Sequence, residues 1–67
     1  PYADWLKGPL ADVLADTLSE QSVLKAGLFD PKAVTRIHQE FLAGQRPWSH
    51  PWLLMVVELW RRNVLQG

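Results

Sequence analysis

Near the middle of the chain stands the stretch Gly27-Leu28-Phe29-Asp30-Pro31-Lys32-Ala33-Val34, which predicts the end of one helix and the start of the next. Its glycine can adopt the left-handed conformation that commonly terminates a helix. Asp30 is suited to cap the following helix and Pro31 to occupy its first position, where a proline loses no hydrogen bond. Phe29 and Val34 stand at the two positions of a hydrophobic staple. This stretch predicts a compact helical unit.

Two helices are predicted on the N-terminal side of this stretch. Gly8-Pro9 indicates a helix start. The residues that follow repeat at helical spacing and form one apolar stripe: Leu10, Val13, Leu14, Thr17 and Leu18. Ser19 is suited to cap a short second helix over 20–26, with Val23 and Leu24 as its core residues.

The third helix is predicted to run from Pro31 to Ala43 and to stop at Gly44. Three of its apolar residues are expected to face inward: Val34, Ile37 and Phe41. Residues 45–50 are then predicted to form a linker.

Pro51 is expected to open the last helix, with Ser49 or His50 as its cap, and the helix to continue to about Val64 or Leu65. Its first half, residues 52–57, is apolar in every direction of a helical period, which predicts a helix that is central or buried on several sides. Since no stretch alternates with the period of a strand, we expect an all-α fold, a small bundle of about four helices.

Length and composition exclude several classes of protein. A chain of 67 residues forms one domain at most, and a domain of this size buries only about 60% of its unfolded surface, so we expect 1–67 to need a partner surface. Seven Lys and Arg balance seven Asp and Glu, which argues against nucleic acid or an anionic membrane as partner and against a helix-turn-helix DNA-binding unit. The longest apolar run ends at Val57 after six residues, far below the roughly 20 of a membrane span. The absence of cysteine fits a cytoplasmic protein.

The titratable residues form no pattern of a catalytic or metal site. His38 has no second ligand at helical spacing and is interpreted as structural. His50 stands beside Ser49, but the pair lacks the carboxylate and oxyanion donors of an acyl-transfer site. Glu58 and Arg62 are spaced for a helical salt bridge on the solvent side. We therefore expect no catalytic, cofactor-binding or metal-binding residue in this segment.

The adjacent pair Arg61-Arg62 has two interpretations. Positive charge near the C-terminal end of a helix is favourable to the helix dipole. The alternative is a contact with phosphate.

Aromatic residues are concentrated in and beside the last helix. They are interpreted either as core packing or as a docking face, since exposed aromatic patches mark interfaces. The candidate packing or partner face comprises Trp5, Trp48, Trp52, Val56, Leu59 and Trp60. We expect the isolated segment to hide this face by self-association.

Several motifs, taken in order, resemble the C-terminal end of glutamine-dependent asparagine synthetases. They are Pro1-x-x-x-Trp5-Leu6-x-Gly8-Pro9-Leu10, then Gly27-Leu28-Phe29-Asp30-Pro31, then Ala43-Gly44, and last Trp52-Leu53-Leu54-x-x-x-Glu58-Leu59-Trp60. The resemblance covers essentially the whole chain but only a small last part of the family's chain.

The resemblance implies a parent enzyme with two active sites. One is an N-terminal glutaminase with a cysteine nucleophile, and the other is an ATP-pyrophosphatase domain that uses Mg²⁺ and activates aspartate as an acyl-adenylate, from which ammonia gives asparagine. The present segment contains neither that cysteine nor the Ser-Gly-Gly-x-Asp-Ser phosphate loop, so no catalytic residue is carried over. Related amidotransferases share this tail, which leaves the acceptor substrate open.

Two hypotheses follow. In the first, the chain is the non-catalytic C-terminal part of a cytoplasmic asparagine synthetase-like enzyme and packs against the remainder of the synthetase domain. In the second, it is a free-standing interaction module with a Trp-rich docking face. A start at Pro1 without an initiator methionine favours the first hypothesis, in which the chain is a piece of a longer protein.

Overall fold

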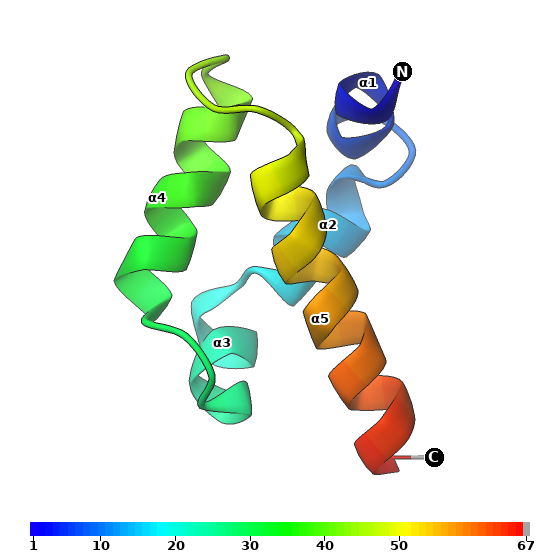
Figure 1. Cartoon of the computed structure of the whole chain (residues 1–67), viewed down its shortest axis with the longest axis vertical. Coiled ribbons are helices and arrows are strands. Elements are labelled where there is room, and N and C mark those ends of the chain that lie inside the picture. Colours follow the sequence, from blue (N-terminus) through cyan, green and yellow to red (C-terminus); the bar gives the residue numbers. More distant parts are fainter. Residues whose placement is uncertain (67) are drawn as a thin grey trace.

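The computed structural model of the chain consists of packed helices (Figure 1). The five helices are α1 (Tyr2–Lys7), α2 (Ala11–Thr17), α3 (Glu20–Ala26), α4 (Pro31–Leu42) and α5 (Ser49–Gln66). The structure describes residues 1–66, with side chains described as far as residue 65. Within those residues no strand occurs, so the all-α class is confirmed. α4 and α5 lie side by side and run in opposite directions, while α2 packs on α5 and α3 packs on α4.

The first helix was not predicted. α1 has only six residues, and Leu6 is the one that it buries. A single buried side chain gives no periodicity from which a helix could be recognised. Lys7 places its ammonium 5.1 Å from the centre of the Phe41 ring, a cation–π contact that joins α1 to α4.

The start of the next helix was predicted too early. Gly8-Pro9 forms a turn in which the backbone N–H of Leu10 donates to the carbonyl of Trp5 at 2.8 Å, and α2 begins only at Ala11. Within the predicted apolar stripe, Val13 is exposed rather than buried. The remaining members are buried or half-buried and face the core: Leu10, Leu14, Thr17 and Leu18.

The central pair of helix ends is confirmed. Ser19 caps α3 by accepting a hydrogen bond from the backbone N–H of Ser22 at 3.2 Å, and Gly27 ends the helix in the left-handed conformation. Asp30 caps α4 by accepting from the N–H of Lys32 at 3.1 Å.

Core residues of these two helices were predicted with mixed success. Val23 is buried, but Leu24 is 60% exposed, so its assignment to the core is wrong. Val34 is buried and lines a small hollow together with Phe29, which itself stays partly exposed. Helix α4 ends one residue before the predicted position.

The last helix begins two residues before the predicted Pro51, so the C-terminal part of the predicted linker is helical. The N–H of Trp52 donates to the carbonyl of Trp48 at 3.1 Å. Pro51 is tolerated two positions further in than expected, because the first N–H groups of a helix have no partner within it. Its side chain is buried.

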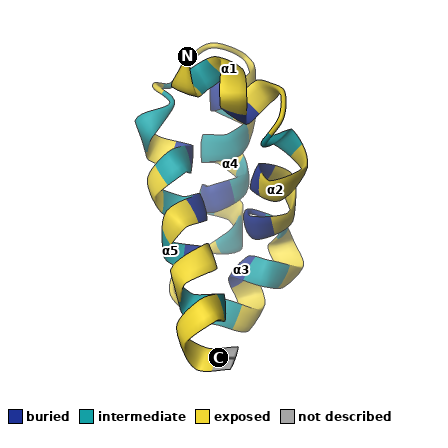
Figure 2. Ribbon diagram, turned by 90° about the vertical axis from the view of Figure 1, so that its right-hand side faces the viewer, coloured by how far each residue is buried: buried dark blue, intermediate teal, exposed yellow. Residues whose placement is uncertain are grey.

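The core lies on one side of α5 only (Figure 2). It is formed by Leu6, Leu14, Leu18, Val23, Val34, Phe41 and Met55. Leu53 and Val56 are 61% and 40% exposed, so burial of the first half of this helix on several sides is contradicted for the side that carries them. A helix that is apolar all round therefore presents an apolar side to the exterior.

Candidate functional site

The residues of the predicted face fall into two groups, of which the first surrounds the start of α5. Tyr2 stacks on Trp48 with 4.5 Å between ring centres, and it meets the rings of Trp5 and Trp52 edge-on at 5.3 and 5.8 Å. Trp48 and Trp52 are half-buried, whereas Trp5 is exposed. Tyr2, which sequence reasoning did not single out, is therefore the ring that holds this group together.

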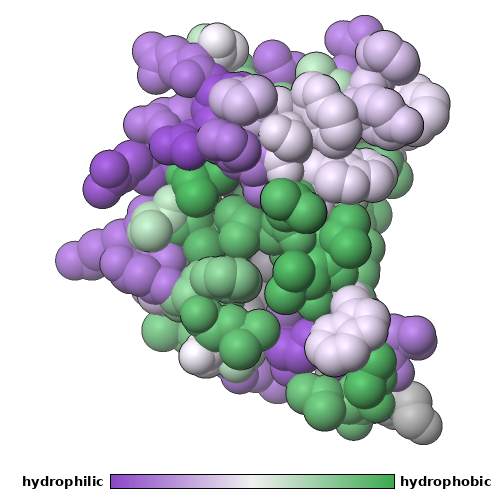
Figure 3. Space-filling model, in the orientation of Figure 1, coloured by the Kyte–Doolittle hydropathy of each residue, from purple (hydrophilic) through white to green (hydrophobic). Residues whose placement is uncertain are grey.

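The second group lies on the open side of α5. Val56, Leu59 and Trp60 are 40%, 40% and 64% exposed, and Leu53 and Val64 extend the same side of the helix. Figure 3 shows hydrophobic atoms gathered over the middle of the molecule and again towards the C-terminal end of α5. We call these five residues the open apolar side.

The apolar surface continues towards the connection between α3 and α4. Leu28 and Phe29, both exposed, line a small hollow together with Leu54 and Val57 of α5.

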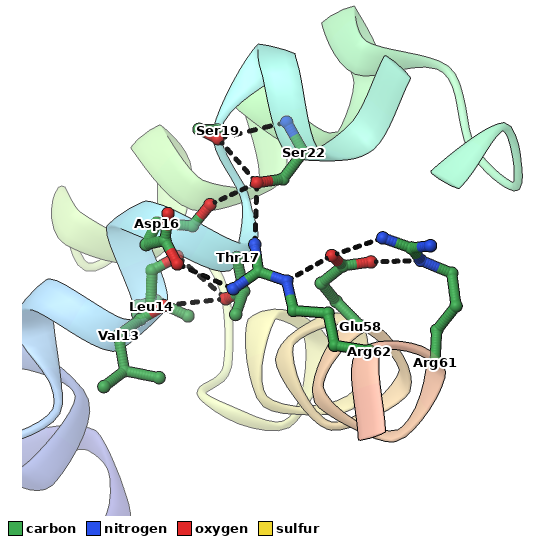
Figure 4. A network of polar contacts seen from close by, with 9 residues as sticks. All are labelled: Val13, Leu14, Asp16, Thr17, Ser19, Ser22, Glu58, Arg61 and Arg62. Atoms are coloured by element: carbon green, nitrogen blue, oxygen red, sulfur yellow. Dashed lines mark hydrogen bonds and ion pairs between the residues drawn. The ribbon is translucent and has the colours of Figure 1, made fainter. Parts of the chain in front are cut away.

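A charged cluster occupies the other side of α5 (Figure 4). The carboxylate of Glu58 is buried, with 6% of the residue exposed. It accepts hydrogen bonds from Arg61 Nε and Nη2 at 2.8 and 2.9 Å and from Arg62 Nε at 2.6 Å. The predicted solvent-side pair of Glu58 and Arg62 is thus a buried carboxylate held by two guanidinium groups, and its placement on the solvent side was wrong.

The surroundings of Glu58 shift its acidity. The hydrogen bond from Arg61 lowers the pKa of the carboxyl, burial opposes this, and the hydrogen bond from Arg62 lowers the pKa further. The net effect is a lowered pKa, so the carboxylate stays ionised despite its burial.

Arg62 links α5 to two other helices. Its Nη1 lies 2.7 Å from the carboxylate of Asp16 on α2, and its Nη2 donates to the hydroxyl of Ser22 on α3 at 2.8 Å. Ser22 in turn donates to the backbone carbonyl of Asp16 at 2.9 Å. These partners lie far from Arg62 in the sequence, so no local spacing could reveal them.

The two histidines have different surroundings. His38 is half-buried, and burial lowers its pKa. His50 Nδ1 lies 3.0 Å from Arg46 Nη1, and Arg46 also pairs with Glu40 at 2.6 Å. The partner of His50 is therefore an arginine rather than the neighbouring serine.

The part of the chain that the structure describes offers little to a metal or a nucleotide. It contains no group of three or more His, Cys, Asp or Glu that could hold a metal ion. The glycines with positive φ in it, Gly27 and Gly44, are used at helix ends and build no phosphate loop. None of the described helices has the length and apolar character needed to cross a membrane.

Comparison with known proteins connects the chain to a family. The family model described as asparagine synthase matches residues 1–62. No curated protein and no solved structure matches the chain. The match spans nearly the whole sequence and includes every motif on which the resemblance depended, so membership of the asparagine synthase family is confirmed.

Proposed function

The chain belongs to the asparagine synthase family, and from this premise we propose that it forms the non-catalytic C-terminal helical part of a glutamine-hydrolysing asparagine synthetase-like enzyme. In this proposal the parent enzyme is cytoplasmic and makes an amide from aspartate with ATP and Mg²⁺. The helical part packs against the synthetase domain and helps to hold it in shape.

One observation supports a packing role above all others, the open apolar side of α5. Its five side chains, from Leu53 to Val64, are each at least 40% exposed. The charged residues among the described part of α5 lie elsewhere, in the Glu58 cluster. An uncharged surface of this kind on a small helical unit is typical of an interface, because it gains stability only when it is covered.

In this proposal the chemistry belongs to the rest of the parent enzyme. ATP would activate the carboxyl group of aspartate there, and the residues that hold ATP and Mg²⁺ would lie outside residues 1–67. We expect the purified chain to release neither pyrophosphate nor glutamate above a buffer control. Release by a contaminant-free preparation would contradict the non-catalytic assignment.

The gene gives the most direct test of the parent. An open reading frame that continues upstream of Pro1 and encodes a Ser-Gly-Gly-x-Asp-Ser loop would support the proposal. A start codon directly before Pro1 would contradict it and favour a free-standing interaction module, for which the open apolar side would be the docking face.

The packing role is tested by charging the surface in the full-length enzyme. We expect Trp60→Lys to lower its melting temperature and its asparagine formation, because a charge would be buried at the interface. Val13→Lys on α2 is the matched control, since Val13 is 37% exposed and lies outside the open apolar side. Equal effects of the two substitutions would contradict packing through α5.

The isolated chain gives a second measurement of the same surface. We expect it to self-associate as its concentration rises from micromolar to near-millimolar, because the open apolar side would then be covered by another copy. Trp60→Lys should restore a monomer in sedimentation, whereas Val13→Lys should not. A monomer at every concentration for the unaltered chain would show that this surface does not drive association.

A further inference from the structure

A hollow of about 320 Å³ opens between α3 and α5 on the charged side of the bundle. It is lined by Gln21, Ser22, Lys25, Glu58, Arg61 and Arg62. Three of these side chains carry positive charge and one carries negative charge. Asp16, which is not part of the lining, pairs with Arg62 and offsets one of the positive charges. Three positive side chains therefore face two negative ones, and the surplus of charge at the hollow is positive.

The two arginines of the hollow differ in how many of their donors are used. Arg62 directs Nε, Nη1 and Nη2 to Glu58, Asp16 and Ser22 respectively. Arg61 directs only Nε and Nη2 to Glu58, and its Nη1 donates to no other described residue (Figure 4). Arg61 therefore keeps Nη1 without a partner among the described residues, whereas each of the three guanidinium nitrogens of Arg62 has one.

Arg61 is held in place before any ligand arrives. Its side chain is 14% exposed, and both of its hydrogen bonds go to the buried carboxylate of Glu58. A guanidinium group that is already oriented loses less conformational freedom on binding than a mobile one. On the opposite wall Lys25 forms no ion pair with any described residue. The hollow thus presents a fixed donor and a flexible cation.

We propose that this hollow binds an oxyanion, a carboxylate or a phosphate, through Arg61 Nη1 and Lys25 Nζ, with the Gln21 amide as a neutral donor. Hydrogen bonds between ionised partners are the stronger ones, and arginine is well suited to both anions. The source of the anion is either an acidic side chain of a polypeptide or the phosphate group of a small ligand. The proposal does not rest on the proposed function, since the hollow is built entirely from this chain.

The test uses the 67-residue chain and two probes, acetate and inorganic phosphate, titrated at constant ionic strength with chloride as the balancing anion. We expect a saturable shift of the Arg61 Nε–H resonance in NMR spectra, whereas a general salt effect would move exposed side chains equally and without saturation. A stronger response to phosphate indicates a phosphate ligand, and an equal or stronger response to acetate indicates an acidic side chain. Absence of saturation with both probes would overturn the proposal.

Lys25→Gln is the variant of choice, because Lys25 is exposed and its loss should leave the fold intact. Arg61→Gln would leave Glu58 without one of its partners and could unfold the helix end. We expect Lys25→Gln to weaken binding about two- to fivefold, as for loss of one partly exposed charge pair. Lys32→Gln on α4 is the matched control, since Lys32 lines a different hollow, and it should bind like the unaltered chain. Equal weakening by both substitutions would overturn the site.

Discussion

The start of α5, together with Trp48 just before it, holds the N-terminal helix through aromatic rings, whereas the later turns of α5 are joined to α2 and α3 through Arg62, whose guanidinium group also binds the buried carboxylate of Glu58. At the upper end, Tyr2 stacks on Trp48 and both rings remain partly accessible to solvent. At the lower end, Glu58 is almost completely buried and accepts three hydrogen bonds. The same helix is therefore joined to the bundle by two kinds of force.

The difference matters for how each end responds to change. Contacts between apolar surfaces are non-directional. Replacement of a ring by a smaller side chain therefore lowers the stability of the protein roughly in proportion to the buried area that is lost. A buried ionic cluster behaves otherwise, because removal of one partner leaves the remaining charges without compensation. We therefore expect the lower end to be the more sensitive to single substitutions.

The largest effect is expected from Glu58→Gln. This substitution preserves the size of the side chain but leaves Arg61 and Arg62 without their shared anion. We expect the free energy of unfolding to fall by about 2–3 kcal/mol, the order found when a charged hydrogen-bonding partner is lost from a buried site. The urea midpoint at neutral pH measures this. Glu20→Gln on the exposed surface of α3 is the control and should change the free energy by less than about 0.5 kcal/mol.

The pH dependence of stability sharpens this test. Since the folded-state pKa of Glu58 is lowered, its contribution is present above the unfolded pKa of about 4.3 and is lost as pH falls through the folded value. The pKa of His38 is also lowered, by burial, so acidification below about 6.5 destabilises the fold through that group as well. Glu58→Gln should abolish the loss of stability that occurs below about pH 4.3 and should leave the loss that His38 causes below about pH 6.5 unchanged. If the low-pH loss persists unchanged in the variant, Glu58 is not its source.

A smaller effect is expected at the aromatic end. Full truncation of a buried tryptophan costs about 3–5 kcal/mol, and Trp48 is only half-buried, so we expect Trp48→Ala to cost about 1–2 kcal/mol. Trp48→Phe keeps a ring against Tyr2 and should recover part of the loss. The aromatic end should also show little dependence on salt. Strong salt dependence of the Trp48→Ala effect would contradict the division of α5 into an apolar and an ionic end.

Sequence reasoning succeeded at the central helix ends, where the signal was local, although the equally local signals at Pro9 and Pro51 misplaced the starts of α2 and α5. The caps at Ser19 and Asp30 and the left-handed Gly27 are determined by neighbouring residues, and they were located correctly. It failed where the partner was distant. The spacing of Glu58 and Arg62 is the same for an exposed pair as for a buried one, and the contact of Arg62 with Asp16 joins residues 46 positions apart.

Two further failures have the same cause. A helix with apolar residues in every direction does not indicate which side meets the core, so the exposure of Leu53 could not be inferred from the pattern. Leu24 has the correct spacing for a core residue. The short helix α3 nevertheless buries only the side that carries Val23 and leaves Leu24 exposed. In both cases the packing of neighbouring helices, rather than the periodicity, determines what is buried.

The smallest effect is expected for Asp16→Asn, and it separates the two partners of Arg62. Asp16 pairs with Arg62 at 2.7 Å, much as Glu58 does, but its side chain is 64% exposed. Water screens an exposed pair and the pair must still order two side chains, so such pairs contribute about 0–1 kcal/mol. We therefore expect Asp16→Asn to lower the free energy of unfolding by about 0.5 kcal/mol. Asp12→Asn on the same helix is the control, since Asp12 forms no ion pair with a described residue. Arg62 keeps Glu58 and Ser22 in the variant, which limits the loss further. A cost as large as that of Glu58→Gln would show that burial does not distinguish the two carboxylates and that the cluster acts as one cooperative unit.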